Sequence, residues 1–214
     1  MMRFFRAIFD AILPQKARVA RTQTYTLKDL ELSPTTHEAY GVQITTLMSY
    51  RTKAVEDLIR ALKYDGAKHA SHALAEALGE YLQEEIAHIK LFSSKSVLLV
   101  PISLHSERLR ERGFNQIEVV LNALPEEFKN GKLTTLSPRT LTRIRNTPQQ
   151  TRLSRNERLK NVEGAFAVSD EKTLQDTHVI LIDDVTTTGA TLSSAAQTLK
   201  KTGVSFSMIA LARA

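Results

Sequence analysis

Two short runs of uninterrupted apolar residues, 96–102 and 178–182, constrain the fold of this chain more than any other feature. A strand buried on both faces has this pattern, because helices cover a parallel sheet from both sides. Other strands, shorter or less apolar, are expected at 41–47, 140–144, 165–168 and 207–211. The sequence therefore predicts an α/β fold built on a mostly parallel sheet.

Stretches with helical spacing of apolar residues separate these strands. They lie at 55–62, 68–89, 115–124 and 190–201. Strands that alternate with helices predict right-handed crossovers that place helices on the faces of the sheet. Ligands of such sheets bind beyond the carboxyl ends of the strands. We expect the chain to consist of an N-terminal extension, 1–47, and a main domain, 48–214.

The N-terminal residues 1–13 have an amphipathic pattern that predicts a helix ending at Pro14. We expect this helix to pack against the protein, with attachment to a membrane surface as the alternative. The chain has no cysteine and no apolar run of membrane-spanning length. Arg6 and Asp10 interrupt the stretch that a signal peptide would need. A cytoplasmic protein without a membrane span is expected.

Chemically distinctive residues follow the strand at 178–182. Asp183 and Asp184 come first, and a loop of small hydroxyl residues around Gly189 then leads into a helix. Backbone N–H groups at a helix N-terminus favour a phosphate, whereas adjacent carboxylates favour hydroxyl groups or a divalent cation. A ribose 5-phosphate offers both kinds of group. The alternative is that these residues only cap the helix. The eight glycines are too widely spaced for G-x-G-x-x-G or Walker A loops.

The whole net charge of +6 lies in residues 139–160, and the rest of the chain is balanced at 22 basic and 22 acidic residues. This segment contains one acid, Glu157, and seven basic residues: Arg139, Arg143, Arg145, Arg152, Arg155, Arg158 and Lys160. The excess of arginine over lysine favours phosphate oxygens, which guanidinium groups bind two at a time. A solvated basic helix is the alternative.

Residues 179–191 resemble the phosphoribosyl-diphosphate (PRPP) binding motif of type I phosphoribosyltransferases at every defining position. The resemblance implies the fold of that family. It also implies that Asp183 and Asp184 take the ribose 2- and 3-hydroxyls and help to place Mg²⁺. The loop that would hold the 5-phosphate consists of Thr186, Thr187, Thr188, Gly189, Ala190 and Thr191.

A narrower resemblance, to the ComF family of competence-associated phosphoribosyltransferase-like proteins, extends over about residues 50–213. It is carried by Leu62-Lys63-Tyr64-x-Gly66, Val100-Pro101-Ile102, Arg108, Arg112-Gly113-Phe114-Asn115-Gln116 and the segment from Arg143 to Phe166. Members of that family commonly carry a four-cysteine zinc ribbon at the N-terminus. No ligand cysteine follows Leu13-Pro14-Gln15 here, so zinc is not expected.

The phosphoribosyltransferase resemblance implies two further groups of binding residues. A loop after the first core strand would hold the pyrophosphate, with Ser103, Leu104, His105, Arg108 and Arg112. The basic segment 139–160 would form a hood that closes over the reacting centre and excludes water, with Arg143, Arg145 and Gln150 as its binding residues.

Two functions from different classes follow. The first is a phosphoribosyltransferase that binds PRPP with Mg²⁺ and transfers the pentosyl group to an acceptor. Thr187 stands where purine-salvage relatives often carry an Asp, which argues against hypoxanthine or guanine as the acceptor. The second is a protein that handles single-stranded DNA during uptake. Residues 139–160 contain no aromatic side chain for base stacking, which weighs slightly against the second function.

Overall fold

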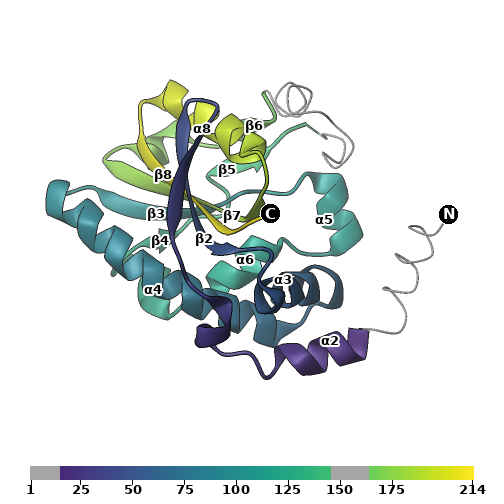
Figure 1. Ribbon diagram of the computed structural model, residues 1–214. Coiled ribbons are helices and arrows are strands. Elements are labelled where there is room, and N and C mark those ends of the chain that lie inside the picture. Colours follow the sequence, from purple (N-terminus) through teal and green to yellow (C-terminus); the bar gives the residue numbers. More distant parts are fainter. Residues whose placement is uncertain (1–14, 146–163) are drawn as a thin grey trace.

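The computed structural model describes residues 15–145 and 164–214, and a six-stranded sheet runs through its centre (Figure 1). The strand order is β1-β2-β8-β7-β3-β4. Every neighbouring pair is parallel except β1 and β2, which form an antiparallel hairpin. The strands are β1 (Thr35–Ala39), β2 (Val42–Ser49), β3 (Ser96–Pro101), β4 (Thr135–Leu136), β7 (Thr177–Thr186) and β8 (Ser205–Arg213).

Different layers cover the two faces of this sheet (Figure 1). On one face lie α3 (Lys53–Asp65), α4 (Lys68–Phe92) and α6 (Gln116–Asn122). On the other face lie α8 (Ala190–Thr202) and a small antiparallel sheet of β5 (Leu141–Arg143) and β6 (Phe166–Val168). The remaining elements are α2 (Gln15–Thr22), α5 (Ser106–Arg112), and the 3₁₀ helices η1 (Leu27–Leu30), η2 (Glu126–Phe128) and η4 (Glu171–Leu174).

Alternation along β7 decides which layer each of its side chains meets. Val179 and Leu181 pack in the core beneath α8, whereas Ile180 and Ile182 pack in the core beneath α3 and α4. Continued alternation directs Asp183 towards the α8 side and Asp184 towards the α3 side. The two adjacent acids therefore face different layers of the protein.

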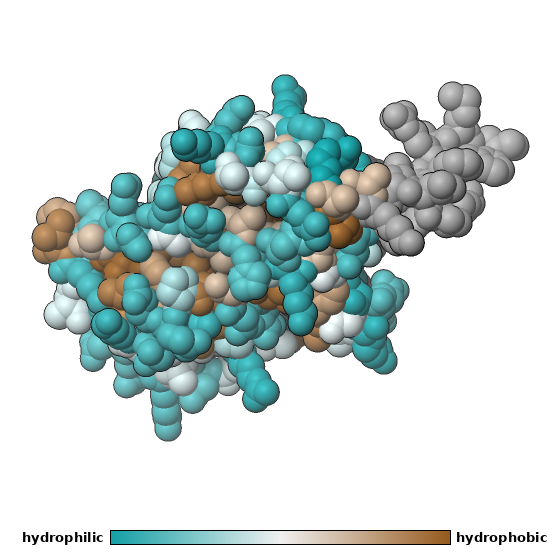
Figure 2. Space-filling model, turned by 90° about the horizontal axis from the view of Figure 1, so that it is seen from below, coloured by the Kyte–Doolittle hydropathy of each residue, from teal (hydrophilic) through white to brown (hydrophobic). Residues whose placement is uncertain are grey.

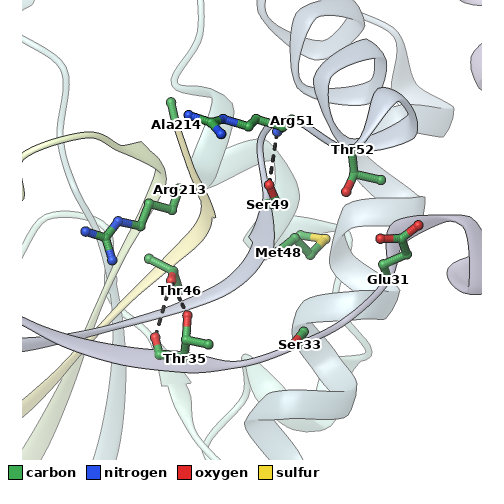
Figure 3. A pocket seen from close by; sticks show the side chains of 10 residues that line it. All are labelled: Glu31, Ser33, Thr35, Thr46, Met48, Ser49, Arg51, Thr52, Arg213 and Ala214. Carbon is green, nitrogen blue, oxygen red and sulfur yellow. Dashed lines mark hydrogen bonds between the residues drawn. The ribbon is translucent and has the colours of Figure 1, made fainter.

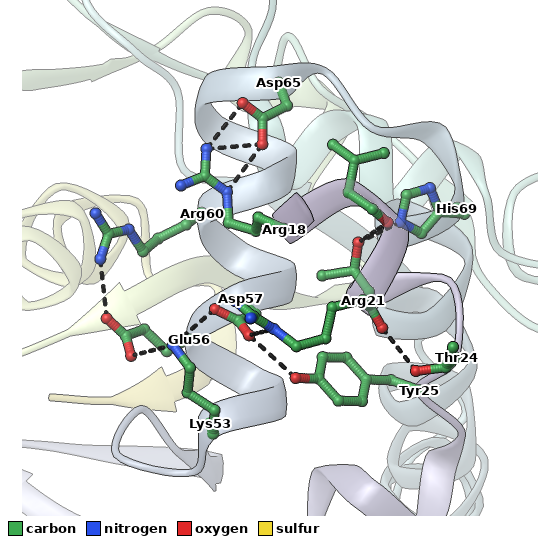
Figure 4. Close-up of polar contacts among 12 residues, drawn as sticks. Arg18, Arg21, Thr24, Tyr25, Lys53, Glu56, Asp57, Arg60, Asp65 and His69 are labelled. Atoms are coloured by element: carbon green, nitrogen blue, oxygen red, sulfur yellow. Dashed lines mark hydrogen bonds and ion pairs between the residues drawn. The ribbon is translucent and has the colours of Figure 1, made fainter. Parts of the chain in front are cut away.

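Helix α2 is attached to α3 by buried ion pairs (Figure 4). Arg18 donates to both carboxylate oxygens of Asp65, at 2.7–2.9 Å, and both side chains are less than 10% exposed. The carboxylate of Asp57, at the other end of α3, accepts from Arg21 Nε at 2.7 Å, Lys53 Nζ at 2.9 Å and the Tyr25 hydroxyl at 3.0 Å. These contacts fix the position of α3, whose last turn carries Lys63.

The predicted α/β class, with a mostly parallel sheet flanked by helices, is confirmed. Strand β7 continues to Thr186, so Asp183 and Asp184 lie within the last residues of the strand, where the sequence had placed them after its end. The sequence did not predict β1, β4, α2 or α5. The predicted division after residue 47 falls inside β2, which pairs with β8 in the main sheet.

The predicted N-terminal helix at 1–13 and most of the predicted hood lie outside the described residues. No helix in the described part of the chain has the length and hydropathy needed to cross a membrane. Seen from below, on the side of α2, α3 and α4, the surface is largely hydrophilic with apolar side chains scattered between the polar ones (Figure 2).

Candidate functional site

The register of β3 and β7 brings the two chemically distinctive loops together. Pro101 lies opposite Ile182, and the Ile102 N–H donates to the Ile182 carbonyl at 2.8 Å. The loop after β3 therefore leaves the sheet beside Asp183 and Asp184, at the carboxyl edge. A cavity of about 200 Å³ opens here, lined by residues of α3, the loop after β3, α5, α6, β5, β7 and α8.

Most of the predicted site residues that carry side-chain chemistry meet in this cavity. Its lining includes Ser103, Leu104, Arg108, Arg112, Arg143, Asp183, Asp184 and Thr191. Of the predicted phosphate loop only Thr191 lines the cavity, and the rest of that loop, Thr186, Thr187, Thr188, Gly189 and Ala190, does not. His105 and Arg145 are not part of the lining either. His105 is the N-cap of α5, where its Nδ1 accepts from the Glu107 N–H at 3.4 Å, and Arg145 lies at the exposed end of the segment after β5. Gln150 lies outside the described residues.

The predicted phosphate loop packs tightly against the β1–β2 hairpin. Gly189, the N-cap of α8, has φ +80°, and a Cβ added there would lie 2.6 Å from Ala39 Cβ and 2.7 Å from Ile44 Cδ1. Only glycine suits this combination of backbone angle and close approach. The Ser193 hydroxyl also donates to the Ala39 carbonyl at 3.1 Å. The hairpin thereby holds the N-terminus of α8 in place.

The N-terminus of α8 has the properties of an anion-binding end. Its first turn carries no acidic residue, and no side chain caps it. The Thr188 hydroxyl oxygen is buried and has no hydrogen-bond partner in the described part of the chain. Buried hydroxyl groups normally form a hydrogen bond, so a ligand or a water molecule is expected to supply the partner here. The helix dipole and the first N–H groups favour an anion at the same place.

Asp183 and Asp184 are linked to each other and to Lys63. The Asp184 N–H donates to Asp183 Oδ1 at 2.9 Å, and the Val185 N–H donates to Asp184 Oδ1 at 2.6 Å. Lys63 Nζ, from the last turn of α3, lies 2.8 Å from Asp184 Oδ2. Burial, reinforced by the charge of Asp184, raises the pKa of Asp183 to about 7. Burial lowers the pKa of Lys63, but the charge and hydrogen bond of Asp184, together with the charge of Asp183, outweigh burial, so the net pKa is raised.

Arg143 approaches the acids from the β5–β6 layer. Its residue is only 8% exposed, and its guanidinium lies 5.5 Å from the centre of the Phe166 ring. Burial and the neighbouring charge of Arg108 lower its pKa, whereas Asp183 acts in the opposite direction. Each acid therefore has its own cation: Arg143 lies near Asp183 on the α8 side of the sheet, and Lys63 lies beside Asp184 on the α3 side.

A second cavity, of about 340 Å³, adjoins the first and shares three basic residues with it: Lys63, Arg108 and Arg112. Its other lining residues are Tyr64, Glu111 and Phe114. Tyr64 is 63% exposed, so one face of its ring is accessible from the cavity. This cavity therefore combines aromatic faces with positive charge beside the acid pair.

A third cavity, of about 440 Å³, lies at the carboxyl ends of β2 and β8 (Figure 3). Hydroxyl side chains such as Ser33, Thr35 and Thr52 line it, together with Arg51 and Arg213. None of the residues predicted from the sequence belongs to it. Although this cavity is larger, the first cavity remains the candidate site because more charged side chains converge there.

Several residues that line these cavities were not among the predicted site residues, and Lys63, Tyr64 and Gln116 are three of them. Gln116 is 2% exposed, lines the first cavity, and its Nε2 has no hydrogen-bond partner in the described part of the chain. Ser103 Oγ lines the same cavity, is also buried, and also has no hydrogen-bond partner in the described part of the chain. The motifs that contain these residues were visible in the sequence, but their three-dimensional positions were not.

The raised pKa of Asp183 predicts a pH dependence of stability. Because the pKa rises from 3.8 to about 7 on folding, the folded protein binds more protons than the unfolded chain between these values. Stability therefore falls as the pH rises through this interval. D183N removes the titrating group, so the Tm of D183N minus that of the wild type should grow as the pH rises from about 4 to about 7 and then stay constant. A difference in Tm that stays constant over this rise in pH would contradict this assignment.

Comparison with known proteins identifies the class. The family model described as the phosphoribosyl transferase domain matches residues 67–213, more than half of the chain, so the chain belongs to this family. The mostly parallel central sheet flanked by helices is thus that of a type I phosphoribosyltransferase fold. Together with the relatives that follow, the match makes the chain a type I phosphoribosyltransferase-like protein of the ComF family.

Similar curated proteins include a DNA utilization protein YhgH from Salmonella typhimurium, 31% identical over 61% of this chain and 56% of that protein. A competence protein ComFC from Streptococcus pneumoniae is 27% identical over 78% of this chain and 66% of that protein. The chain therefore spans between half and two thirds of the length of these relatives. A crystal structure of a hypoxanthine phosphoribosyltransferase from Staphylococcus aureus aligns over 68% of this chain and 64% of that chain, with 16% identity and a TM-score of 0.37.

Proposed function

We propose that the first cavity binds the ribose 5-phosphate part of PRPP and that the protein acts on this sugar phosphate. The observation that carries the proposal is the convergence of two carboxylates and the N-terminus of α8 at one sheet edge. The carboxylates of Asp183 and Asp184 are suited to accept hydrogen bonds from a vicinal diol. The N–H groups and hydroxyls of the Thr186–Thr191 loop are suited to the 5-phosphate.

The basic residues of the cavity support a pyrophosphate at the opposite end of the same ligand. Arg108 and Arg112 follow the loop at Ser103, and Arg143 enters from the β5–β6 layer. Guanidinium groups bind phosphate oxygens in pairs, and a low-dielectric cavity strengthens each contact. The buried Ser103 hydroxyl would gain the partner that it lacks in the described part of the chain.

Mg²⁺ fits this site chiefly as a companion of the pyrophosphate. Carboxylate oxygens suit Mg²⁺, but the described residues contain no cluster of three acidic, histidine or cysteine side chains. In phosphate sites, Mg²⁺ usually keeps several waters and is shared between one or two carboxylates and the ligand. When bound, it would supply charge neutralisation on the leaving pyrophosphate.

The reaction that these residues support is displacement at C1 of the ribose. The bond between C1 and the pyrophosphate oxygen breaks, pyrophosphate leaves with the electron pair, and an acceptor atom forms the new bond to C1. Arg108, Arg112 and Arg143 would stabilise the charge that develops on the leaving group. The acid pair would orient the sugar through its hydroxyls.

A second candidate function, handling of single-stranded DNA, is supported by the aromatic cavity. Tyr64 and Phe114 offer rings for base stacking, and the neighbouring Arg108 and Arg112 offer contacts to the phosphate backbone. Residues 139–160 contain no aromatic side chain, but α3 and the segment after α5 supply rings for base stacking. The composition of 139–160 therefore does not weigh against DNA binding. Relatives named for DNA utilization and competence agree with it.

A thermal-shift titration separates the two functions. If the sugar-phosphate proposal holds, ribose 5-phosphate and PRPP with Mg²⁺ should both raise the melting temperature. Saturation at about 100 times Kd contributes about 2.7 kcal/mol, or roughly 5–10 °C for a chain of this size. Ribose and inorganic phosphate serve as controls for the two halves of the ligand. Stabilisation by an oligonucleotide, with none by either sugar phosphate, would favour the DNA function and overturn the first proposal.

A further inference from the structure

The ion pair between Lys63 and Asp184 places a fixed positive charge inside the candidate site. Lys63 Nζ lies 2.8 Å from Asp184 Oδ2, and the two side chains are only 21% and 17% exposed. Lys63 also lies close enough to Asp183 to counteract the rise of its pKa. A partly buried pair of this kind holds its geometry better than a surface ion pair, which solvent and salt weaken.

The rest of the fold determines where this lysine stands. Lys63 belongs to the last turn of α3, and the carboxylate of Asp65, two residues later, is held by Arg18 through three contacts of 2.7–2.9 Å (Figure 4). Asp57 attaches the first half of the same helix to α2. The end of α3 is therefore anchored from outside the site, and Lys63 is held in position before any ligand arrives.

The carboxylate oxygens of the acid pair are already largely occupied. Asp183 Oδ1 and Asp184 Oδ1 accept backbone N–H groups, and Asp184 Oδ2 contacts Lys63. Only Asp183 Oδ2 remains without a hydrogen bond from the described part of the chain. An Mg²⁺ ion that bound both acids would compete with Lys63 for Asp184 Oδ2.

We propose that Lys63 is the resident cation of the acid pair, so that the protein binds the diol end of ribose 5-phosphate without a divalent metal. This inference rests on the proposed function and assigns Lys63 a positioning role: it acts through Asp184. Two adjacent carboxylates would otherwise repel an anionic ligand, and the ammonium group offsets that repulsion. A requirement for Mg²⁺ would then arise only from the pyrophosphate of PRPP.

The inference separates two kinds of metal dependence. Ribose 5-phosphate has no pyrophosphate, so its affinity for the wild-type protein should be the same in excess EDTA and in excess Mg²⁺, within about twofold. In K63M the acid pair loses its counter-charge, and the affinity in EDTA should fall at least about tenfold, which corresponds to about 1.4 kcal/mol. Mg²⁺ should restore part of this loss, because it can then occupy the vacated place beside Asp184.

The experiment is isothermal titration of the full chain with ribose 5-phosphate under both conditions. K63R should retain the wild-type behaviour, because it keeps the positive charge. K129M is the matched control: Lys129 forms a 2.8 Å ion pair with Glu126 and its side chain is 18% exposed, but it lies outside the cavities described above. Its affinity and metal response should equal those of the wild type. Thermal unfolding checks that each variant is folded.

Three outcomes would overturn the inference. A wild-type affinity that falls tenfold in EDTA would show that a metal, not Lys63, serves the acid pair, and this result does not depend on any variant. A K63M protein that binds like the wild type in EDTA would show that the lysine is dispensable. In both cases the proposed function survives, because ribose 5-phosphate still binds. Absence of binding to every form under both conditions would overturn the proposed function and this inference together.

Discussion

D183N/D184N is expected to abolish binding of ribose 5-phosphate, with a loss of affinity of at least about 100-fold. Each carboxylate is placed to accept a hydrogen bond from a ribose hydroxyl, and hydrogen bonds to charged groups contribute about 1.5–3 kcal/mol each. The loss of two such bonds amounts to about 3 kcal/mol, which is about two orders of magnitude in Kd. Isothermal titration of the double variant and of each single variant measures the loss.

D176N is the matched control for this experiment. Asp176 is exposed and lies at the opposite end of β7, and its positive φ of 52° is one that asparagine tolerates. The control changes one acid to its amide directly before the same strand, so its affinity should equal that of the wild type. Wild-type affinity in a folded D183N/D184N protein would contradict the roles assigned to both acids.

G189A is expected to destabilise the protein and to weaken phosphate binding at the same time. A left-handed backbone costs a residue with a Cβ about 1–2 kcal/mol, and a forced contact in a packed region adds about 1–3 kcal/mol. The new methyl group would meet Ala39 Cβ and Ile44 Cδ1 at less than 3 Å; Ala39 Cβ moves only with the backbone, and the Ile44 side chain is fully buried. We expect a loss of about 3 kcal/mol in the free energy of unfolding, or roughly 6–12 °C in Tm.

G203A separates the two causes of that loss. Gly203 caps the other end of α8 with a φ of +73°, and a Cβ there would meet nothing within 4 Å. This variant should therefore show only the backbone cost, about 1 kcal/mol, and should keep the affinity for ribose 5-phosphate. Equal destabilisation by G189A and G203A would show that the close approach to the β1–β2 hairpin does not matter.

The sequence was sufficient for those parts of the fold that local pattern determines. The runs at 96–102 and 178–182 are short and mainly apolar, as expected of strands covered on both faces, and both form central strands. The short edge elements were harder to predict. In β1, Thr35 to Ala39 is a mostly exposed strand whose pairing with β2 depends on the turn at Tyr40 and Gly41. Its pattern alone does not differ from that of a polar loop.

The candidate site was predictable where its residues follow one another and not where the fold brings them together. Asp183 and the Thr186–Thr191 loop form one continuous motif with a recognisable chemistry. Lys63 reaches Asp184 only because α3 packs beneath the end of β7, and Gln116 reaches the cavity only because Asn115 caps α6, with its side-chain amide donating to the Ile102 carbonyl at 3.0 Å. No spacing in the sequence encodes these contacts.

The division of the acid pair between the two faces of β7 has a mechanical consequence. Asp184 is tied through Lys63 to the layer of α3 and α4, whereas Asp183 faces Arg143 and the layer of β5 and β6. Under the proposed function, a sugar bound by both acids would join two layers that the sheet otherwise separates. A substitution that shifts either layer should therefore change the affinity for the sugar.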